Sequence, residues 1–128
     1  MASRFSELII DAHDLQRLAQ FWCDVLGYRV LEETDEVVEI GAVPITAEDV
    51  RRAPIAPPLV FVRVPEDKTV KNRVHIDVSP IDRSQQEEVD RLIALGATRV
   101  DIGQGDVSWV VMADLEGNEF CVLRSLQP

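Results

Sequence analysis

The sequence repeats one order of elements in its two halves. In the first half, an apolar segment that ends in an acid, Glu7-Leu8-Ile9-Ile10-Asp11, precedes an amphipathic stretch that stops at Leu26-Gly27. In the second half, His75-Ile76-Asp77-Val78 precedes a similar stretch that stops at Leu95-Gly96. Short apolar segments follow both glycines. Because such a repeat decides the architecture, the sequence predicts an α+β fold in which each half is a strand, a helix and about three further strands.

Length, charge and cysteine usage narrow the class of protein. A chain of 128 residues makes a single domain, here 1–128, built from half-domains at 5–65 and 72–125 that share a core. Its net charge of −10 argues against nucleic acid or an anionic membrane as a partner, because phosphate binding needs clustered Lys and Arg. No apolar run in the sequence approaches the ~20 residues of a membrane span. The N-terminus lacks the apolar segment of a signal peptide, and Cys23 and Cys121 are far apart, so we expect a cytoplasmic protein with reduced thiols.

The two helices have clear boundary signals. Asp14 is the predicted N-cap of a helix over 15–26, and Gly27 suits the position that ends it. Asp82 or Ser84 caps the second helix, where Ser84 and Glu87 have the spacing of a capping box. We expect the core to combine the apolar stripes of both helices with alternating strand residues: Leu15, Leu18, Trp22, Leu26, Val89, Leu92 and Ile93 against Leu8, Ile10, Val74, Ile76 and Val78.

Strands are predicted where β-branched and aromatic residues gather, at 5–12, 28–33, 36–41, 59–64, 73–79, 98–102, 107–113 and 119–124. Segment 42–58 contains four prolines, which exclude a continuous helix or a central strand. Thr46 is expected to cap a short helix that ends near Arg52. A long irregular segment of this kind is either a lid or binding loop, or an insertion without a role.

Segment 72–78 alternates with the period of a half-buried strand. On this pattern His75 and Asp77 share one face of the strand, opposite the apolar residues. An imidazole beside a carboxylate indicates a polar site, and the alternative is a hydrogen-bonded structural histidine. Nearby, Lys68, Lys71 and Arg73 form the densest basic cluster, which is either a solvated linker or an anchor for an anionic ligand.

Four segments of the sequence carry a family resemblance. They are Phe21-Trp22 before Leu26-Gly27, then Val64-Pro65-Glu66, Lys71-Asn72-Arg73-Val74-His75-Ile76-Asp77, and the closing Asp114-Leu115-Glu116-Gly117-Asn118-Glu119-Phe120-Cys121. With them the chain resembles the vicinal oxygen chelate superfamily, and within it the small glyoxalase-like domain proteins, over about residues 5–125. The resemblance implies two βαβββ modules whose mixed or antiparallel sheet curls around a shared, cup-shaped cleft. It also implies a homodimer.

The resemblance also implies positions for a metal. Metal-dependent members of that superfamily place ligands on the first and last strands of the modules, and the matching positions here are Glu7, Val62, His75 and Cys121. Glu7, His75 and Cys121 are the ligands if a divalent metal is present. Val62 has no electron pair to donate, magnesium and manganese prefer several oxygens, and zinc needs three well-placed protein ligands. We therefore expect no cofactor and no stoichiometric metal.

Two main functions follow from these positions. The first is a metal-free protein that binds a small, apolar or weakly anionic molecule in the cleft through Glu7, His75, Asp77, Trp109 and Cys121, with Lys71 or Arg73 holding an anion at its mouth. The alternative is a metal-dependent lyase, isomerase or dioxygenase that acts on a small oxygenated substrate, with Glu7 or His75 as general base. A third hypothesis is a regulatory dimer without a ligand.

Overall fold

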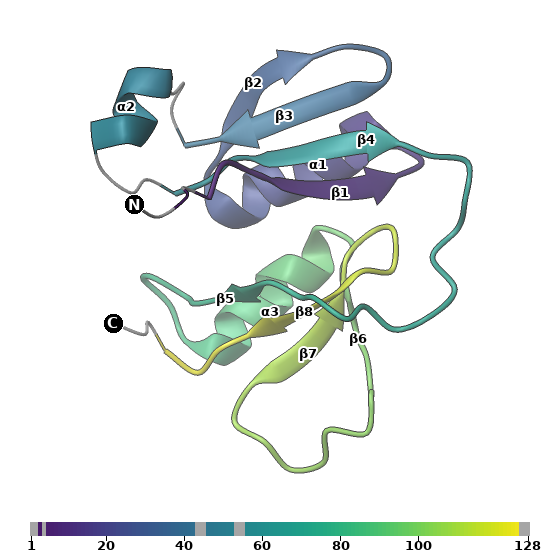
Figure 1. Cartoon of the computed structure of the whole chain (residues 1–128). Helices are drawn as coiled ribbons and strands as arrows, with labels where there is room; N and C mark the ends of the chain where they lie inside the picture. Colours follow the sequence, from purple (N-terminus) through teal and green to yellow (C-terminus); the bar gives the residue numbers. More distant parts are fainter. Residues whose placement is uncertain (1–2, 4, 43–45, 53–55, 126–128) are drawn as a thin grey trace. The chain divides into compact units, whose positions relative to one another are not determined.

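The computed structural model divides into two compact units, Met1–Asp67 and Lys68–Pro128 (Figure 1). It describes residues 3, 5–42, 46–52 and 56–125. Each unit has a strand, a helix and three further strands, with a short second helix before the last strand of the first unit, and each forms its own four-stranded sheet. The α+β class and the βαβββ pattern predicted from the repeat are therefore confirmed. Pro44 and Pro54 of the irregular segment lie outside the described residues.

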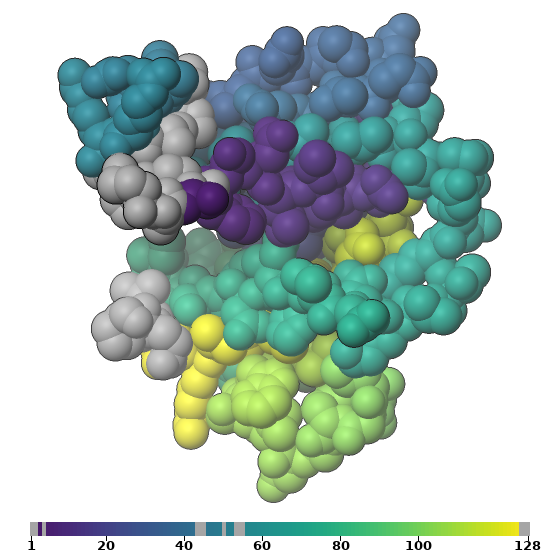
Figure 2. All heavy atoms as spheres, viewed as in Figure 1, coloured from purple at the N-terminus to yellow at the C-terminus, as the bar shows by residue number. Residues whose placement is uncertain are grey.

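The first unit contains β1 (Leu8–Ala12), α1 (Leu15–Leu26), β2 (Arg29–Glu33), β3 (Val37–Gly41), α2 (Ala47–Arg52) and β4 (Leu59–Arg63). The strand order in its sheet is β1-β4-β3-β2. β1 runs parallel to β4, and the other pairs are antiparallel. α1 packs against β3 and β4, so one face of the sheet is covered by the helix. The atoms of β1, purple in Figure 2, are visible on the face shown, in keeping with the 56% exposure of Ile9.

The boundaries of α1 match the prediction. The Asp14 carboxylate accepts a hydrogen bond from the Arg17 N–H at 3.3 Å, which satisfies one of the free donors of the first turn. At the other end, Gly27 has φ of 70° and donates its N–H to the Cys23 carbonyl at 2.9 Å. Glycine adopts this left-handed conformation without steric cost because it has no Cβ.

The core of the first unit lies between α1 and the sheet. Its fully buried side chains include Leu15, Leu18 and Trp22 of α1, Val38 and Ile40 of β3, and Phe61 of β4. Burying each of these side chains contributes roughly 1.5–3 kcal/mol relative to leaving it exposed, so the contact between α1 and the sheet strongly stabilises this unit. Leu8, Ile10 and Leu26, which we expected in the core, are only half-buried.

The predicted short helix in segment 42–58 is confirmed as α2. The Thr46 hydroxyl accepts the Asp49 N–H at 3.2 Å, and the Asp49 carboxylate accepts the Thr46 N–H at 2.9 Å. This reciprocal pair caps the first turn and explains why six residues can form a helix inside an otherwise irregular segment.

The second unit contains β5 (Asp77–Val78), α3 (Gln85–Ala94), β6 (Thr98–Arg99), β7 (Val110–Ala113) and β8 (Glu119–Val122). The strand order is β5-β8-β7-β6, with β5 parallel to β8 and the other pairs antiparallel. α3 begins with the predicted capping box: the Ser84 hydroxyl accepts the Glu87 N–H at 3.1 Å, and Glu87 accepts the Ser84 N–H at 3.0 Å. Its buried residues Val89 and Leu92 pack in a core that also contains Met112, Phe120 and Val122.

The predicted core of the second unit is wrong at Ile93 and Val74 and holds only in part at Ile76. Ile93 is 45% exposed, because the buried stripe of α3 runs through Glu88, Val89 and Leu92. The Glu88 carboxylate tolerates burial because the Arg91 guanidinium contacts it at 2.7 Å. Val74 is 72% exposed and Ile76 is half-buried, because only Asp77 and Val78 of the predicted strand 73–79 pair with β8.

The strands around residues 100–109 are also shorter than predicted. β6 ends at Arg99 rather than at residue 102, and β7 begins at Val110 rather than at residue 107. Between them a loop forms its own hydrogen bonds: the Asp101 carboxylate accepts the Gly103 N–H, and Gln104 accepts the Ile102 N–H, both at 2.8 Å. These local acceptors compete with the sheet for backbone donors. Among the described residues, no helix is long and apolar enough to cross a membrane.

Candidate functional site

The pairing of β5 with β8 brings three side chains of different chemistry together. Asp77 lies directly opposite Cys121 in the parallel pair, and the Cys121 N–H bonds to the Ile76 carbonyl at 3.0 Å. His75, two residues before Asp77, places its Nε2 3.1 Å from the Asp77 carboxylate. One potential ligand atom from each of His75, Asp77 and Cys121 lies within 4.8 Å of the other two. We call these residues the His-Asp-Cys cluster.

The protonation of Cys121 decides what the cluster can do. Burial raises the pKa of its thiol, and the charge of Asp77 and a hydrogen bond to that carboxylate raise it further, against a smaller lowering by Lys71. The thiol is therefore protonated near neutral pH, whereas a nucleophilic cysteine needs a lowered pKa or a base that takes its proton. Because its hydrogen-bond partner is a carboxylate that favours the thiol form, the cluster as it stands is not an activated nucleophile.

The cluster lies in a hollow of about 310 Å³ in the second unit. The residues that line it are Lys71, His75, Asp77, Ile102, Gln104, Trp109, Val111, Glu119, Cys121 and Leu123. Alternation along β8 explains part of this set, because Glu119, Cys121 and Leu123 point away from the buried Phe120 and Val122. Trp109 precedes β7 and is 41% exposed, so its ring forms an accessible wall. The lining thus combines apolar residues with the polar side chains of the His-Asp-Cys cluster, Lys71 and Glu119.

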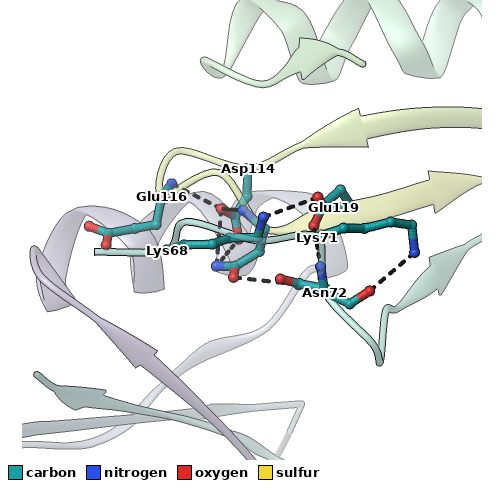
Figure 3. A network of polar contacts seen from close by, with 7 residues as sticks. Lys68, Lys71, Asn72, Asp114, Glu116 and Glu119 are labelled. Atoms are coloured by element: carbon teal, nitrogen blue, oxygen red, sulfur yellow. Dashed lines mark hydrogen bonds and ion pairs between the residues drawn. The ribbon is translucent and has the colours of Figure 1, made fainter. Parts of the chain in front are cut away.

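A polar network holds the segment that leads into the cluster (Figure 3). The Glu119 carboxylate binds the Lys68 ammonium at 3.0 Å through one oxygen and accepts the Asn72 N–H at 3.0 Å through the other. The turn before β8 is fixed by Asp114, whose carboxylate accepts the N–H groups of Glu116 and Asn118 at 2.9 and 3.0 Å. Segment 68–72 is therefore fastened to the start of β8.

The same network keeps Glu119 ionised. Burial alone would raise the pKa of Glu119, but the Asn72 N–H and the Lys68 ammonium together outweigh it and lower the pKa. Lys71 is not used in this carboxylate contact; its ammonium bonds to the Asn72 carbonyl at 3.1 Å (Figure 3). Lys71 is thus a cation that lines the hollow, whereas the Glu119 charge is already neutralised by Lys68.

Four of the five predicted ligand-binding residues line this hollow, and the fifth, Glu7, belongs to the first unit. Glu7 comes just before β1 and is exposed. Its charge acts on Glu39 of β3, whose pKa is raised first by burial and then by the carboxylates of Glu7 and Glu32. Val62 lies on β4 opposite Asp11 and offers no donor atom. The participation of Glu7 in the site stays a prediction.

Sequence reasoning missed two contributions to the site. It named Lys68 only as part of a basic cluster, whereas this side chain pairs with Glu119 and does not line the hollow. It also left out Glu119, although the spacing of two residues between Glu119 and Cys121 places both on one face of a strand. Arg73, an expected anion anchor, is not part of the lining.

Comparisons with known proteins agree with the fold. A profile of the glyoxalase-like domain family matches residues 7–123. No match was found among curated proteins. The fosfomycin resistance protein FosX from Mesorhizobium loti is 13% identical with a TM-score of 0.68, covering 99% of this chain and 95% of that chain. Glyoxalase I from Leishmania major is 18% identical with a TM-score of 0.64, covering 96% and 87%.

One similar structure contains a metal. FosX from Listeria monocytogenes, in a complex with Mn(II) and 1S,2S-dihydroxypropylphosphonic acid, is 14% identical with a TM-score of 0.67, covering 98% of this chain and 93% of that chain. At these identities the likeness concerns the fold. The family match, by contrast, spans nearly the whole chain, and this protein belongs to the glyoxalase-like domain family of the vicinal oxygen chelate superfamily.

Proposed function

We propose that this protein binds a small molecule with an apolar face and a weakly anionic group in the hollow of the second unit. The observation that carries the proposal is the lining of that hollow, which combines an accessible Trp109 with the His-Asp-Cys cluster and Lys71. Ligand sites are typically apolar concavities of roughly 300–1,000 Å³ with a few polar groups that fix orientation. The volume of about 310 Å³ suits a ligand at the small end of that range.

The charges around the hollow set the expected chemistry of the ligand. Glu119 is neutralised by Lys68, which leaves Lys71 as the cation that lines the hollow together with Asp77 and His75. A carboxylate or phosphonate group on the ligand can pair with Lys71, while its apolar part contacts Trp109, Ile102 and Leu123. A ligand-binding role of Glu7 and a cytoplasmic location are further parts of this proposal.

A metal-dependent enzyme is the second candidate, and one observation favours it. The four-position site implied by the family resemblance is incomplete at Val62, but His75, Asp77 and Cys121 bring three donor atoms within 4.8 Å of one another. These residues fit a metal ion, which would polarise an oxygen of the substrate as a Lewis acid. The enzyme would then belong to the lyase, isomerase or dioxygenase class, with Glu7 or His75 as the candidate general base.

Phenylacetate and its neutral amide test the binding proposal as a matched pair. We expect phenylacetate to quench the fluorescence of Trp109 in the wild type and in Trp22→Phe, because Trp22 is buried and only 1% exposed. Phenylacetamide should bind at least about tenfold more weakly, since a charge-assisted bond contributes roughly 1.5–3 kcal/mol. Lys71→Met should remove this preference for the anion, and His75→Ala should weaken binding of both compounds without unfolding the protein.

Arg73→Met is the control for Lys71→Met, because both residues are basic and lie in the same segment but only Lys71 lines the hollow. The proposal is wrong if Arg73→Met abolishes the preference as completely as Lys71→Met. It is also wrong if the quenching of wild-type fluorescence persists in Trp109→Phe.

A further inference from the structure

We infer that Gln85, the first residue of α3, is a positioning residue that fixes the Trp109 wall of the ligand hollow and so sets which ligands fit there. This role rests on the proposed function, since it concerns the same hollow. The Gln85 Nε2 donates one hydrogen bond to the Ser108 carbonyl at 2.9 Å and another to the Val122 carbonyl at 3.0 Å. Ser108 comes directly before Trp109, and Val122 comes directly before Leu123. A residue that does not itself line the hollow thus holds two segments that do.

Trp109 needs such a support because it lies beyond the end of the sheet. β7 begins at Val110, which pairs with Val122, the last residue of β8, so the ladder between these strands does not include Trp109. The loop that joins β6 to β7 extends away from the sheet (Figure 1), and its hydrogen bonds within 101–104 close turns inside the loop. Those bonds shape the loop without attaching its end to the helix. The Gln85 amide makes that attachment.

The chemistry of the Gln85 side chain suits this role. A side-chain amide nitrogen has two N–H donors, and here it serves one carbonyl on each segment. The Gln85 side chain is half-buried and its bond to Val122 is partly buried, so water competes for this bond less than at an open surface. The first turn of α3 is itself fixed by the capping box of Ser84 and Glu87. Because binding sites need side chains held to within about 0.5 Å by the residues behind them, a rigid helix end is an effective support for the wall.

A fixed Trp109 indole makes the hollow selective for flat ligands. Phenylacetate has a flat ring that packs against an indole, whereas cyclohexylacetate has the same number of carbon atoms, the same charge and a puckered ring. Contacts between aromatic rings favour the flat ligand by roughly two- to twelvefold in affinity. A Trp109 ring that moves loses this geometry. Gln85 therefore controls the preference between the two rings, while Lys71 pairs with the carboxylate that both ligands share.

Two measurements on the Trp22→Phe protein, in which Trp109 is the remaining one of two tryptophans, test this role. Time-resolved fluorescence anisotropy reports the motion of the Trp109 ring without a ligand, and titrations give the ratio of the dissociation constants of phenylacetate and cyclohexylacetate. Gln85→Met keeps the length of the side chain but has no donor. We expect it to increase the fast component of the anisotropy decay and to lower the preference for phenylacetate from roughly two- to twelvefold towards onefold. Gln85→Lys should restore both, because an ammonium donates to carbonyls and its charge affects both ligands equally.

Gln86→Met is the matched control, because Gln86 lies in the same turn of α3 but bonds to Arg99 and Asp90. Denaturant unfolding compares the stabilities of the variants. If Gln85→Met does not fold, Gln85→Asn replaces it, since its amide is one methylene too short to reach both carbonyls.

Unchanged anisotropy in Gln85→Met, or an equal change in Gln86→Met, overturns the inference. So does a Trp22→Phe protein that binds both ligands equally, or a preference that Gln85→Met leaves unchanged. If the Trp22→Phe protein binds neither ligand while Gln85→Met still increases the motion of Trp109, the proposed function fails and the positioning of Trp109 by Gln85 stands.

Discussion

At the scale of single residues, Glu119 has a larger role than its position at the edge of the hollow suggests. Its two carboxylate oxygens hold Lys68 and the backbone of Asn72, and this fixes the segment that leads into His75. The Lys68 and Glu119 side chains are only 22% and 13% exposed, so solvent screens their ion pair less than a surface pair. Glu119 is thus a positioning residue whose effect on the site passes through residues 68–72.

We predict that Glu119→Gln destabilises the protein by roughly 1–3 kcal/mol at pH 7, the range for a buried hydrogen-bonded charge. The pKa of Glu119 in the folded protein is lower than its ordinary value of 4.5. Its contribution is therefore complete above about pH 4.5 and is lost as the pH falls through the lower, folded pKa. Denaturant unfolding at pH 7 and at about pH 3.5 measures this, with the exposed Glu66→Gln as control. An equal difference at both pH values would contradict it.

Individual site residues could be predicted where their chemistry and spacing coincide. His75, Asp77 and Cys121 were named from the sequence, and the structure places them together. The strand predicted around His75 is reduced to Asp77 and Val78. Before them the Ile76 carbonyl still accepts the Cys121 N–H, but Asn72 is held by the Glu119 side chain rather than by a strand ladder. A period-two pattern does not distinguish a strand paired in a sheet from an extended segment held by side-chain hydrogen bonds. For this reason the exposure of Val74 was not predicted.

At the scale of elements, the two sheets differ on the face turned away from their helices. In the second sheet that face carries Cys121, Val111 and the hollow. In the first sheet it carries Glu39, which lies between Glu32 on β2 and Val60 on β4 in the pairing register. Glu39 is only partly exposed and has the carboxylates of Glu7 and Glu32 as neighbours, so negative charges repel one another on this face. Such local conflicts are often found at functional surfaces.

We predict that Glu39→Gln stabilises the protein by roughly 0.2–1 kcal/mol at pH 7, the scale of a cross-strand pair. Burial, then Glu7 and Glu32, raise the pKa of Glu39 above its ordinary value of 4.5. The cost of its charge is therefore absent below about pH 4.5 and complete once the pH exceeds the raised, folded pKa. Unfolding at pH 7 and about pH 4 tests this, with Glu33→Gln, an exposed acid on β2 opposite Val38, as control. If Glu39→Gln destabilises the protein at pH 7, the predicted repulsion between Glu39 and its neighbouring carboxylates is contradicted.

The helices could be predicted more exactly than the strands, because the residues that bound a helix lie next to it in the sequence. α1 begins and ends where Asp14 and Gly27 indicated, and α3 begins where Ser84 indicated, because a cap is decided within one turn. Strands in the second unit were predicted too long, because a strand ends where its partner ends, and β6 pairs with β7 over only two residues. The residues of a strand do not show how far its partner strand extends. The loop at 100–109 instead satisfies its backbone through Asp101 and Gln104.

At the scale of the whole molecule, the candidate ligand residues are distributed unequally between the two modules. His75, Asp77 and Cys121 lie in the second unit, and the remaining position with a donor, Glu7, lies in the first. The repeat in the sequence predicted two equivalent modules but could not show which would carry the site, because that depends on single positions such as Val62 rather than on the pattern. A duplicated fold thus allows one module to specialise while the other keeps its packing.

The family resemblance implies a homodimer, which is a property of the whole molecule. We expect light scattering to give twice the chain mass of 14.4 kDa at micromolar concentration. β1 and β2 are the edge strands of the first sheet, and β5 and β6 those of the second, so each sheet leaves strands to be covered. Because each chain carries a net charge of −10, two chains repel one another, and added salt shortens the range of that repulsion to about 3 Å at 1 M. The dimer should therefore dissociate less at high salt than at low salt. Dissociation by salt would indicate that ion pairs dominate the interface, and a monomer mass at every salt concentration would contradict the dimer itself.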